Sequence, residues 1–246
     1  MTYGVGVLVR EGLVMMADTR TNAGLDNIAT FRKLHLFDKP GEKMMALATA
    51  GNLGITQAVV SLLREGFRNP DTEQEERLLD QPTLFRAAQF VGHAIRQVHA
   101  SDAAAMERSG ATFEVTMLLG GQFEDSPPRL FMLYKAGNFI EATADTPYLQ
   151  IGEHKYGKPI LDRAVSNATD LNDCLKLSLI SMDSTMRSNL SVGLPIDMVM
   201  LRSGSLNWEV NRRIDETEPY FHDLRERWSS ALRKAHTDIP PPPYRD

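Results

Sequence analysis

The sequence predicts an α+β fold in which two antiparallel sheets are covered on their outer faces by helices. The main observation is the order of the predicted segments, which runs strands, two helices, strands, two helices, strands and a final helix. Grouped strands and grouped helices are typical of layered α+β domains, whereas parallel α/β folds alternate the two. The chain has no internal repeat, so we expect a single domain over residues 1–246, with residues 216–246 forming a C-terminal helix and a proline-rich tail.

The composition argues against several classes of protein. Hydrophobic residues make up 42% and charged residues 24% of the 246 positions, close to the averages of globular proteins. A net charge of −5, without a basic tract interleaved with aromatic residues, argues against a nucleic-acid partner. The single cysteine, Cys174, cannot form a disulfide within the chain, which is typical of a reducing compartment. Without a signal peptide or a long apolar run, we expect a cytoplasmic protein that does not bind a membrane.

The first predicted element is a β-hairpin over residues 1–20. Its two apolar strands are joined at residues 10–12, and a three-residue loop that ends on a left-handed glycine is a common solution. This register pairs Thr2 with Arg20, and because side chains alternate along a strand, Thr2, Asp18 and Arg20 would share one face. A two-residue turn would shift the register by one residue and break this arrangement.

The later strands are predicted from short apolar runs bounded by proline, glycine, asparagine or aspartate. They are expected at residues 32–37, 44–50, 114–120, 129–134, 139–143, 196–202 and 206–212. Helices are predicted where apolar residues recur every three or four positions, and they are expected at residues 53–67, 83–106, 157–168, 171–186 and 218–235. Asn52 is the expected N-cap of the first helix, and the polar residues 21–30 are expected to form a loop.

Thr2 is the first residue that indicates a chemistry. Methionine aminopeptidases remove Met1 when the next residue is small, and the product would carry a hydroxyl and a free α-amine on the same threonine. An α-amine has a pKa of about 7.7–8.0, which suits a general base at neutral pH. Such a threonine is a self-contained pair of nucleophile and base. Threonine is also a common second residue, so its position alone carries little weight.

Three further residues support a catalytic role for Thr2. A buried Lys33 near the hydroxyl would favour the ionised nucleophile, and Asp18 would orient that lysine. Gly51 ends a strand directly before a predicted helix, where unsatisfied backbone N–H groups can form an oxyanion hole. His93 and His99, by contrast, are six residues apart on one predicted helix, which is not the spacing of metal ligands, so we expect neither a metal nor a cofactor.

Together these residues resemble the proteasome β-type N-terminal-nucleophile hydrolases, most closely their bacterial branch called Anbu. The matching segments are Met1-Thr2-Tyr3, residues 17–24, residues 26–33, Ala50-Gly51-Asn52 and residues 191–197. The resemblance covers the chain to about residue 215. It implies a four-layer αββα sandwich and a threonine peptidase that assembles from many copies into an open ring or spiral.

The resemblance also implies roles for individual residues. Thr2 matches the catalytic threonine, Asp18 and Lys33 match its charged partners, and Gly51 matches the oxyanion-hole glycine. Asp183 resembles a later aspartate that helps to hold the amine of the nucleophile.

The substrate implied by the resemblance is a peptide or an unfolded protein. It would lie as an extended strand along Thr21-Asn22 and residues 49–51, by β-augmentation. Thr49 and Leu53 would line the first specificity pocket.

Two positions depart from the proteasome pattern. Glu153 stands where the family has a serine bonded to the amine, and a carboxylate there would raise the pKa of the amine and weaken it as a base. A second serine of the family falls on Met186 in this chain. Ser188 and Ser191 are alternative substitutes. These departures lead us to expect low or conditional peptidase activity.

Two alternatives to a peptidase follow from the same residues. One is an N-terminal-nucleophile amidohydrolase that acts on a small amide, which a closed polar pocket would favour. The other is an assembly protein that keeps the fold without the chemistry, which retention of Met1 and a Glu153 bonded into the site would favour.

Overall fold

Two five-stranded antiparallel sheets lie face to face at the centre of the computed structural model, which describes residues 1–22 and 28–244. The first sheet has the order β12 (Tyr148–Gly152), β1 (Tyr3–Val9), β2 (Gly12–Asp18), β13 (Ile196–Arg202) and β14 (Val210–Ile214). The second has the order β11 (Phe139–Glu141), β10 (Arg129–Leu133), β9 (Val115–Phe123), β6 (Lys43–Gly51) and β5 (Leu34–Lys39). Two short strand pairs lie outside the sheets: β3 (Arg20–Asn22) with β4 (Ile28–Thr30), and β7 (Phe67–Arg68) with β8 (Glu75–Glu76).

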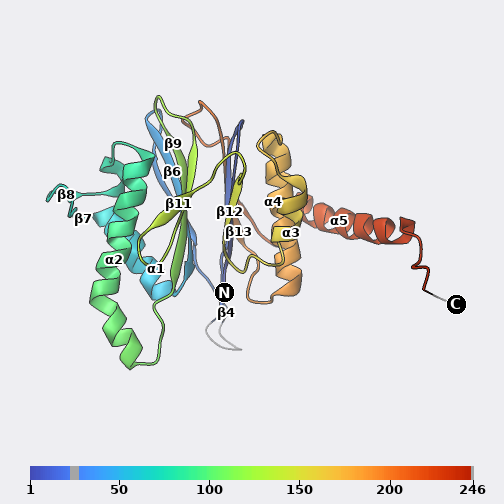
Figure 1. Ribbon diagram of the computed structural model, residues 1–246, viewed down its shortest axis with the longest axis horizontal. Coiled ribbons are helices and arrows are strands. Elements are labelled where there is room, and N and C mark those ends of the chain that lie inside the picture. Colours follow the sequence, from blue (N-terminus) through green and yellow to red (C-terminus); the bar gives the residue numbers. More distant parts are fainter. Residues whose placement is uncertain (23–27, 245–246) are drawn as a thin grey trace.

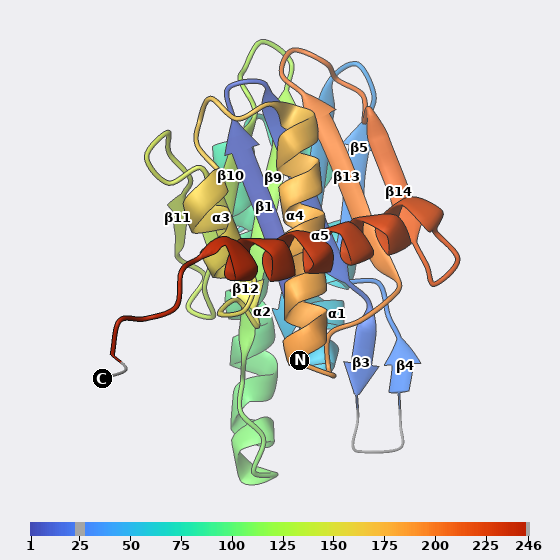
Figure 2. The ribbon, with the colours of Figure 1, turned by 90° about the vertical axis from the view of Figure 1, so that its right-hand side faces the viewer.

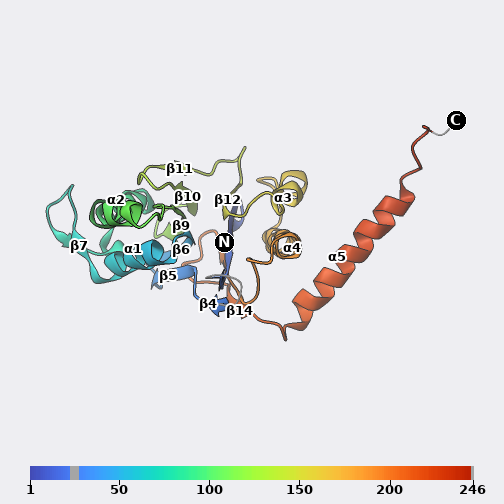
Figure 3. The ribbon, with the colours of Figure 1, turned by 90° about the horizontal axis from the view of Figure 1, so that it is seen from below.

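Helices cover both outer faces of the sheets, so the molecule has four layers (Figure 1). The second sheet carries α1 (Leu53–Glu65), α2 (Leu84–Arg108) and the 3₁₀ turn η1 (Leu78–Asp80). The first sheet carries α3 (Lys158–Ala164) and α4 (Leu171–Ser188). The fifth helix, α5 (Pro219–Asp238), packs on α4 by its first turns and then projects away from the sandwich (Figure 3). This is the αββα sandwich that the resemblance implied.

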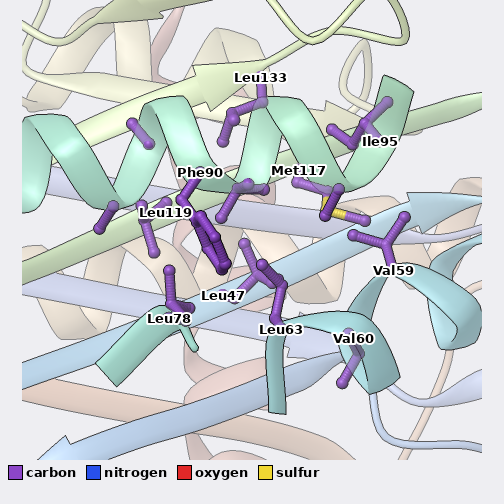
Figure 4. Packing of buried hydrophobic residues seen from close by; sticks show 14 of the residues in the cluster. Leu47, Val59, Val60, Leu63, Leu78, Phe90, Ile95, Met117, Leu119 and Leu133 are labelled. Carbon is purple, nitrogen blue, oxygen red and sulfur yellow. The ribbon is translucent and has the colours of Figure 1, made fainter. Parts of the chain in front are cut away.

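Three apolar layers hold the sandwich together, one between the sheets and one under each helical face. Under α1 and α2, Phe90 and Phe67 stack with their ring centroids 4.3 Å apart, among leucines of both helices and the sheet (Figure 4). Between the sheets, the inward positions of β1 are Gly4 and Gly6, where an added Cβ would lie 2.9 Å from Ile151 and 2.8 Å from Leu130. Small residues therefore allow the two sheets to approach closely.

The predicted strands and helices are present in the predicted order, and Asn52 caps α1 by accepting the N–H of Gly54 at 2.9 Å. Several features differ. The strand β12, the short pair β7–β8 and the turn η1 were not predicted. The strand expected at 206–212 begins only at Val210, and the helix expected at 157–168 spans only Lys158–Ala164. The expected loop over residues 21–30 contains β3 and β4, with residues 23–27 outside the described residues. In the described ranges, no helix is long and apolar enough to span a bilayer.

The predicted register of the first hairpin was wrong. The turn contains only Arg10 and Glu11, so Val9 pairs with Gly12 and Gly4 pairs with Ala17. Gly12 opens β2 and pairs with Val9, so it extends the ladder instead of closing a three-residue loop. Asp18 consequently lies opposite Tyr3 rather than Gly4, and the expected pairing of Thr2 with Arg20 does not occur.

The glycine at the end of this turn is required by a neighbouring strand. A Cβ on Gly12, whose φ is +154°, would lie 2.1 Å from the carbonyl oxygen of Leu201 in β13. We expect Gly12→Ala to reduce the free energy of unfolding by at least about 2 kcal/mol more than Gly41→Ala. Gly41 also has a positive φ, of +85°, but it has no atom within 4 Å of the added Cβ. Urea denaturation of both variants measures the difference, and equal losses would contradict the close contact.

Candidate active site

Four of the predicted site residues meet at one end of the sandwich. Thr2 precedes β1, Asp18 ends β2, Lys33 precedes β5 and Gly51 ends β6, and the N-terminus lies at the end of the molecule where β3 and β4 project (Figure 2). Beside them is a pocket of about 360 Å³. Its lining residues are Met1, Thr2, Thr21, Lys33, Thr49, Ala50, Gly51, Asn52, Leu53 and Thr56. The fold thus brings together residues that are up to 49 positions apart in the sequence.

A buried ion pair organises this end of the sandwich. The Lys33 ammonium donates to Asp18 Oδ1 at 3.0 Å, and the two side chains are 5% and 0% exposed. The same ammonium donates to the backbone carbonyls of Met1, at 3.3 Å, and of Arg20, at 2.5 Å. Lys33 therefore contacts the carbonyl of the peptide bond that precedes Thr2.

The Asp18 carboxylate is held by two backbone groups in addition to Lys33. The N–H of Tyr3 donates to Oδ1 at 3.0 Å, and the N–H of Gly193 donates to Oδ2 at 3.3 Å. Bonds to backbone donors and a cation together compensate the cost of burying a carboxylate. Asp18 thereby fixes the start of β1 against the segment that leads into β13.

Burial controls the proton affinities at this site. Burial lowers the pKa of Lys33, and the Asp18 carboxylate opposes this shift. The α-amine of Met1 also has a pKa below its ordinary value of 8.0, mainly because of burial and secondly because of the Lys33 charge. The charges of Asp18 and Glu153 act in the opposite direction on that amine. A lowered pKa leaves more of an amine in its neutral, basic form at neutral pH.

Glu153 lies beside the backbone of Thr2. Its N–H donates to the Thr2 carbonyl at 2.7 Å, and its Oε2 accepts a hydrogen bond from Asn189 Nδ2 at 2.9 Å. Asn189 also approaches the sulfur of Met1 at 3.8 Å. Glu153 was predicted from the sequence, but Asn189 was not; its position at the end of α4, between the candidate serines Ser188 and Ser191, was the available signal.

Of the two candidate serines, the structure places Ser191 closer to this group. Its N–H donates to Asn189 Oδ1 at 2.9 Å, in the turn that follows α4. Ser188 is the last residue of α4 and is exposed.

Asp183 does not contact Thr2. This fully buried carboxylate accepts from Arg187 Nε at 3.0 Å and from Arg225 Nε at 2.6 Å. Arg225 belongs to α5, so Asp183 joins α5 to α4. The expected contact with the amine is absent because both carboxylate oxygens bind arginines.

Arg20 supports the site from the outside. Its Nη1 donates to the carbonyl of Leu190 at 3.1 Å, and its guanidinium lies flat on Gly193, where an added Cβ would be 2.2 Å from Cζ. Arg20 therefore holds the segment whose Gly193 N–H binds Asp18. It is a positioning residue that does not line the Thr2 pocket.

The predicted substrate residues form one wall of the pocket. Thr49 donates its N–H to the Lys33 carbonyl at 2.8 Å, and the buried hydroxyl of Thr21 has no hydrogen-bond partner among the described residues. Leu53 lines the pocket together with Thr56, which was not predicted from the sequence. Only the backbone of Asn22 is described, in β3.

Gly51 lies at the mouth of the pocket in a conformation that favours glycine. Its φ is +119°, and an added Cβ would lie 2.1 Å from the carbonyl oxygen of Glu114. This close approach to β9 explains the glycine on structural grounds alone.

Neither a metal site nor a reactive thiol accompanies these residues. In residues 1–22 and 28–244, no group of three or more histidine, cysteine, aspartate or glutamate side chains could hold a metal ion. Cys174 is buried on α4, and burial raises the pKa of its thiol to about 12, so it is a core residue.

Comparison with known proteins identifies the relatives of this chain. No family model matches the sequence. Among curated proteins, proteasome subunit beta 2 of Pyrobaculum calidifontis is 22% identical over 213 residues, which cover 85% of this chain and 94% of that subunit. Among solved structures, Anbu (ancestral beta-subunit) from Yersinia bercovieri is 45% identical with a TM-score of 0.89, and the match covers 99% of this chain and 100% of that one.

Two further structures agree with this result. Anbu from Hyphomicrobium sp. strain MC1 is 46% identical with a TM-score of 0.87, over 97% of this chain and 98% of that one. The helical assembly of the Anbu complex from Pseudomonas aeruginosa contains a chain that is 42% identical with a TM-score of 0.91, over 98% of each chain.

The four-layer fold and the likeness to a proteasome β subunit define the class of this protein, a proteasome-like N-terminal-nucleophile hydrolase. Within that class the relationship is closer. Identities of 42–46% over nearly the whole chain show that it belongs to the Anbu family.

The position of Asp183 leads to a test of its role. We expect Asp183→Asn to lower the free energy of unfolding by about 1–3 kcal/mol. This is less than the usual cost of breaking a fully buried ion pair, because the side chains of Arg187 and Arg225 are 51% and 32% exposed to solvent. Hydrogen exchange should increase in α5, and Arg225→Gln should reproduce this increase. Unchanged protection of α5 together with a changed reactivity of Thr2 would instead assign Asp183 to the nucleophile.

Proposed function

We propose that this protein is a threonine peptidase whose nucleophile is Thr2, exposed as the first residue by removal of Met1. The observation that carries the proposal is the position of the Lys33 ammonium. It is paired with the buried Asp18 and also bonded to the carbonyl that precedes Thr2, beside a pocket that Thr2 lines. A cation there would act directly on the freed threonine.

In the proposed mechanism, the Thr2 amine takes the proton of the Thr2 hydroxyl, and the oxygen attacks the carbonyl of the substrate. Lys33 lowers the proton affinity of the hydroxyl, and the Gly51 N–H stabilises the developing oxyanion. The carbon–nitrogen bond of the substrate breaks, and the leaving amine receives the proton from the Thr2 amine. Water then hydrolyses the ester and restores Thr2.

The proposed substrate is an extended peptide or unfolded protein. Its acyl segment would add as a strand beside Thr21-Asn22 and residues 49–51, with a side chain in the pocket of about 360 Å³. Thr49 and Leu53 would form the walls of that pocket, and Thr56 would contribute at the helix α1.

We also propose that the protein works as a homo-oligomer, as an open ring or spiral in the cytoplasm. The support is the described helical assembly of the Pseudomonas aeruginosa relative. The projecting helix α5 is a further support, because residues 230–244 are exposed in the single chain.

Activity should depend on Thr2. We expect Thr2→Ala to abolish labelling by an epoxyketone or β-lactone probe, because no other residue would present both a hydroxyl and an α-amine. Intact-mass and peptide mass spectrometry would locate the label, with Thr237→Ala, an exposed threonine on α5, as the matched control. Persistent Met1 and no labelling in protein from the native host would favour an assembly protein without catalytic activity. Hydrolysis of small amides alone would favour an amidohydrolase.

The pH profile should depend on Glu153. While Met1 is present, the charge of Glu153 acts to raise the pKa of the Met1 α-amine. We expect the same direction for the freed amine of Thr2, because the Glu153 N–H binds the Thr2 carbonyl. Glu153→Gln should therefore lower the pKa of the Thr2 amine and shift the acidic limb of the kcat profile to lower pH. The basic form of the amine would then be present over a wider range, and activity below pH 7 should rise. The alkaline limb should remain, because it would report Lys33, whose pKa is lowered by burial. An acidic limb that does not move would show that Glu153 does not tune the amine.

A further inference from the structure

A second cavity, of about 770 Å³, runs along β12 to Gly152, the residue that lies beside Thr2. Gly152 lines this cavity, and a Cβ added to it would lie 3.4 Å from the Cβ of Thr2. Thr116 lines it too, and it pairs with Ala50 of the Thr2 pocket in the ladder between β9 and β6. The two cavities therefore lie on either side of Thr2: the pocket at β6 is lined by Thr2 itself, and the cavity at β12 is lined by its neighbour Gly152.

The wall of this second cavity is a sheet edge with free backbone groups. β12 is the outermost strand of the first sheet. Its bonds to β1 include the Glu153 N–H to the Thr2 carbonyl and the Leu8 N–H to the Pro147 carbonyl, both at 2.7 Å. Antiparallel pairing alternates, so the N–H and C=O groups of Tyr148 and Gln150 point away from β1.

These outward groups are available for another strand. Over residues 1–22 and 28–244, no hydrogen bond reaches the backbone N–H or C=O of Tyr148 or Gln150 on this side. The carbonyl of Gly152 accepts the N–H of His154 at 3.1 Å, so the free edge ends there, next to Thr2. An unpaired edge is a template for an added extended segment.

We propose that this cavity binds the part of the substrate that follows the scissile bond, as a strand added to the edge of β12. The inference rests on the proposed peptidase function, because it assigns the leaving segment of the same reaction. The acyl segment would lie in the pocket at β6, and the chain would cross Thr2 into the cavity at β12. Since β12 has five residues at about 3.3 Å each, the edge accommodates about three to five residues.

The lining of the cavity defines its preference. Thr116 lines it next to Ala50 of the Thr2 pocket, and Leu149, Ile151 and Met132 give it apolar walls. At the α3 end, Lys158 pairs with Asp162 at 2.7 Å, and Asp145 also lines the cavity, so that end has one excess negative charge. We therefore expect apolar side chains to be preferred in the leaving segment, with acidic side chains disfavoured at the α3 end.

Backbone methylation of the substrate tests the pairing without altering the protein. Four substrates share one acyl segment. The first has an aminocoumarin amide as its leaving group, and the second, the parent peptide, has a five-residue leaving peptide. The third and fourth are the parent peptide with one N-methyl group each, placed on two successive amides beyond the scissile bond. Only alternate amides face a paired strand, so one methylated peptide should lose about tenfold in kcat/KM and the other should match the parent peptide.

A protein variant gives an independent readout. Met132→Trp should fill the cavity and lower the ratio of kcat/KM for the peptide to that for the aminocoumarin amide, whereas the matched Met132→Leu should not change this ratio. Equal kcat/KM for the parent and both methylated peptides, or equal losses from both methylations, would overturn the pairing with β12. Failure to cleave any of the four substrates, the aminocoumarin amide included, would instead overturn the peptidase function itself.

Discussion

The buried pair of Lys33 and Asp18 is the interaction on which the site depends. Removing one partner of a buried ion pair leaves an uncompensated charge, which costs about 3–5 kcal/mol. This pair is bonded to the backbone at several points, through Tyr3, Gly193 and the carbonyls of Met1 and Arg20. The ends of β1 and β2, the start of β5 and the segment before β13 are therefore held in one arrangement, and Thr2 is placed by that arrangement.

The close approach of the two sheets makes this arrangement possible. Gly4 and Gly6 carry no side chain toward the second sheet, so Ile151 of the neighbouring strand β12 and Leu130 of the second sheet fill the space. The strand ends that carry Thr2 and Gly51 consequently face the same small pocket. Gly4 and Gly6 thus contribute both to the packing of the two sheets and to the placement of Thr2 and Gly51 beside one pocket.

The surroundings of Thr2 differ from the proteasome pattern. Glu153 and Asn189 form a hydrogen bond beside the Thr2 backbone, where the family has a serine, and Asp183 is engaged by α5. The C-terminal helix thus takes up a carboxylate that the resemblance assigned to the site. In this chain, Arg225 joins α5 to Asp183 of α4.

The sequence by itself determined the order of strands and helices, because apolar periodicity and turn residues are local properties. It also indicated Thr2, Asp18, Lys33 and Gly51, since their types suit one reaction. Only the tertiary structure decided the two-residue turn of the first hairpin, the pairing of β12 with β1 and the partners of Asp183. Each of these depends on which distant segment packs alongside, and a strand such as β12 or a carboxylate on a helix carries no local signal of its neighbour.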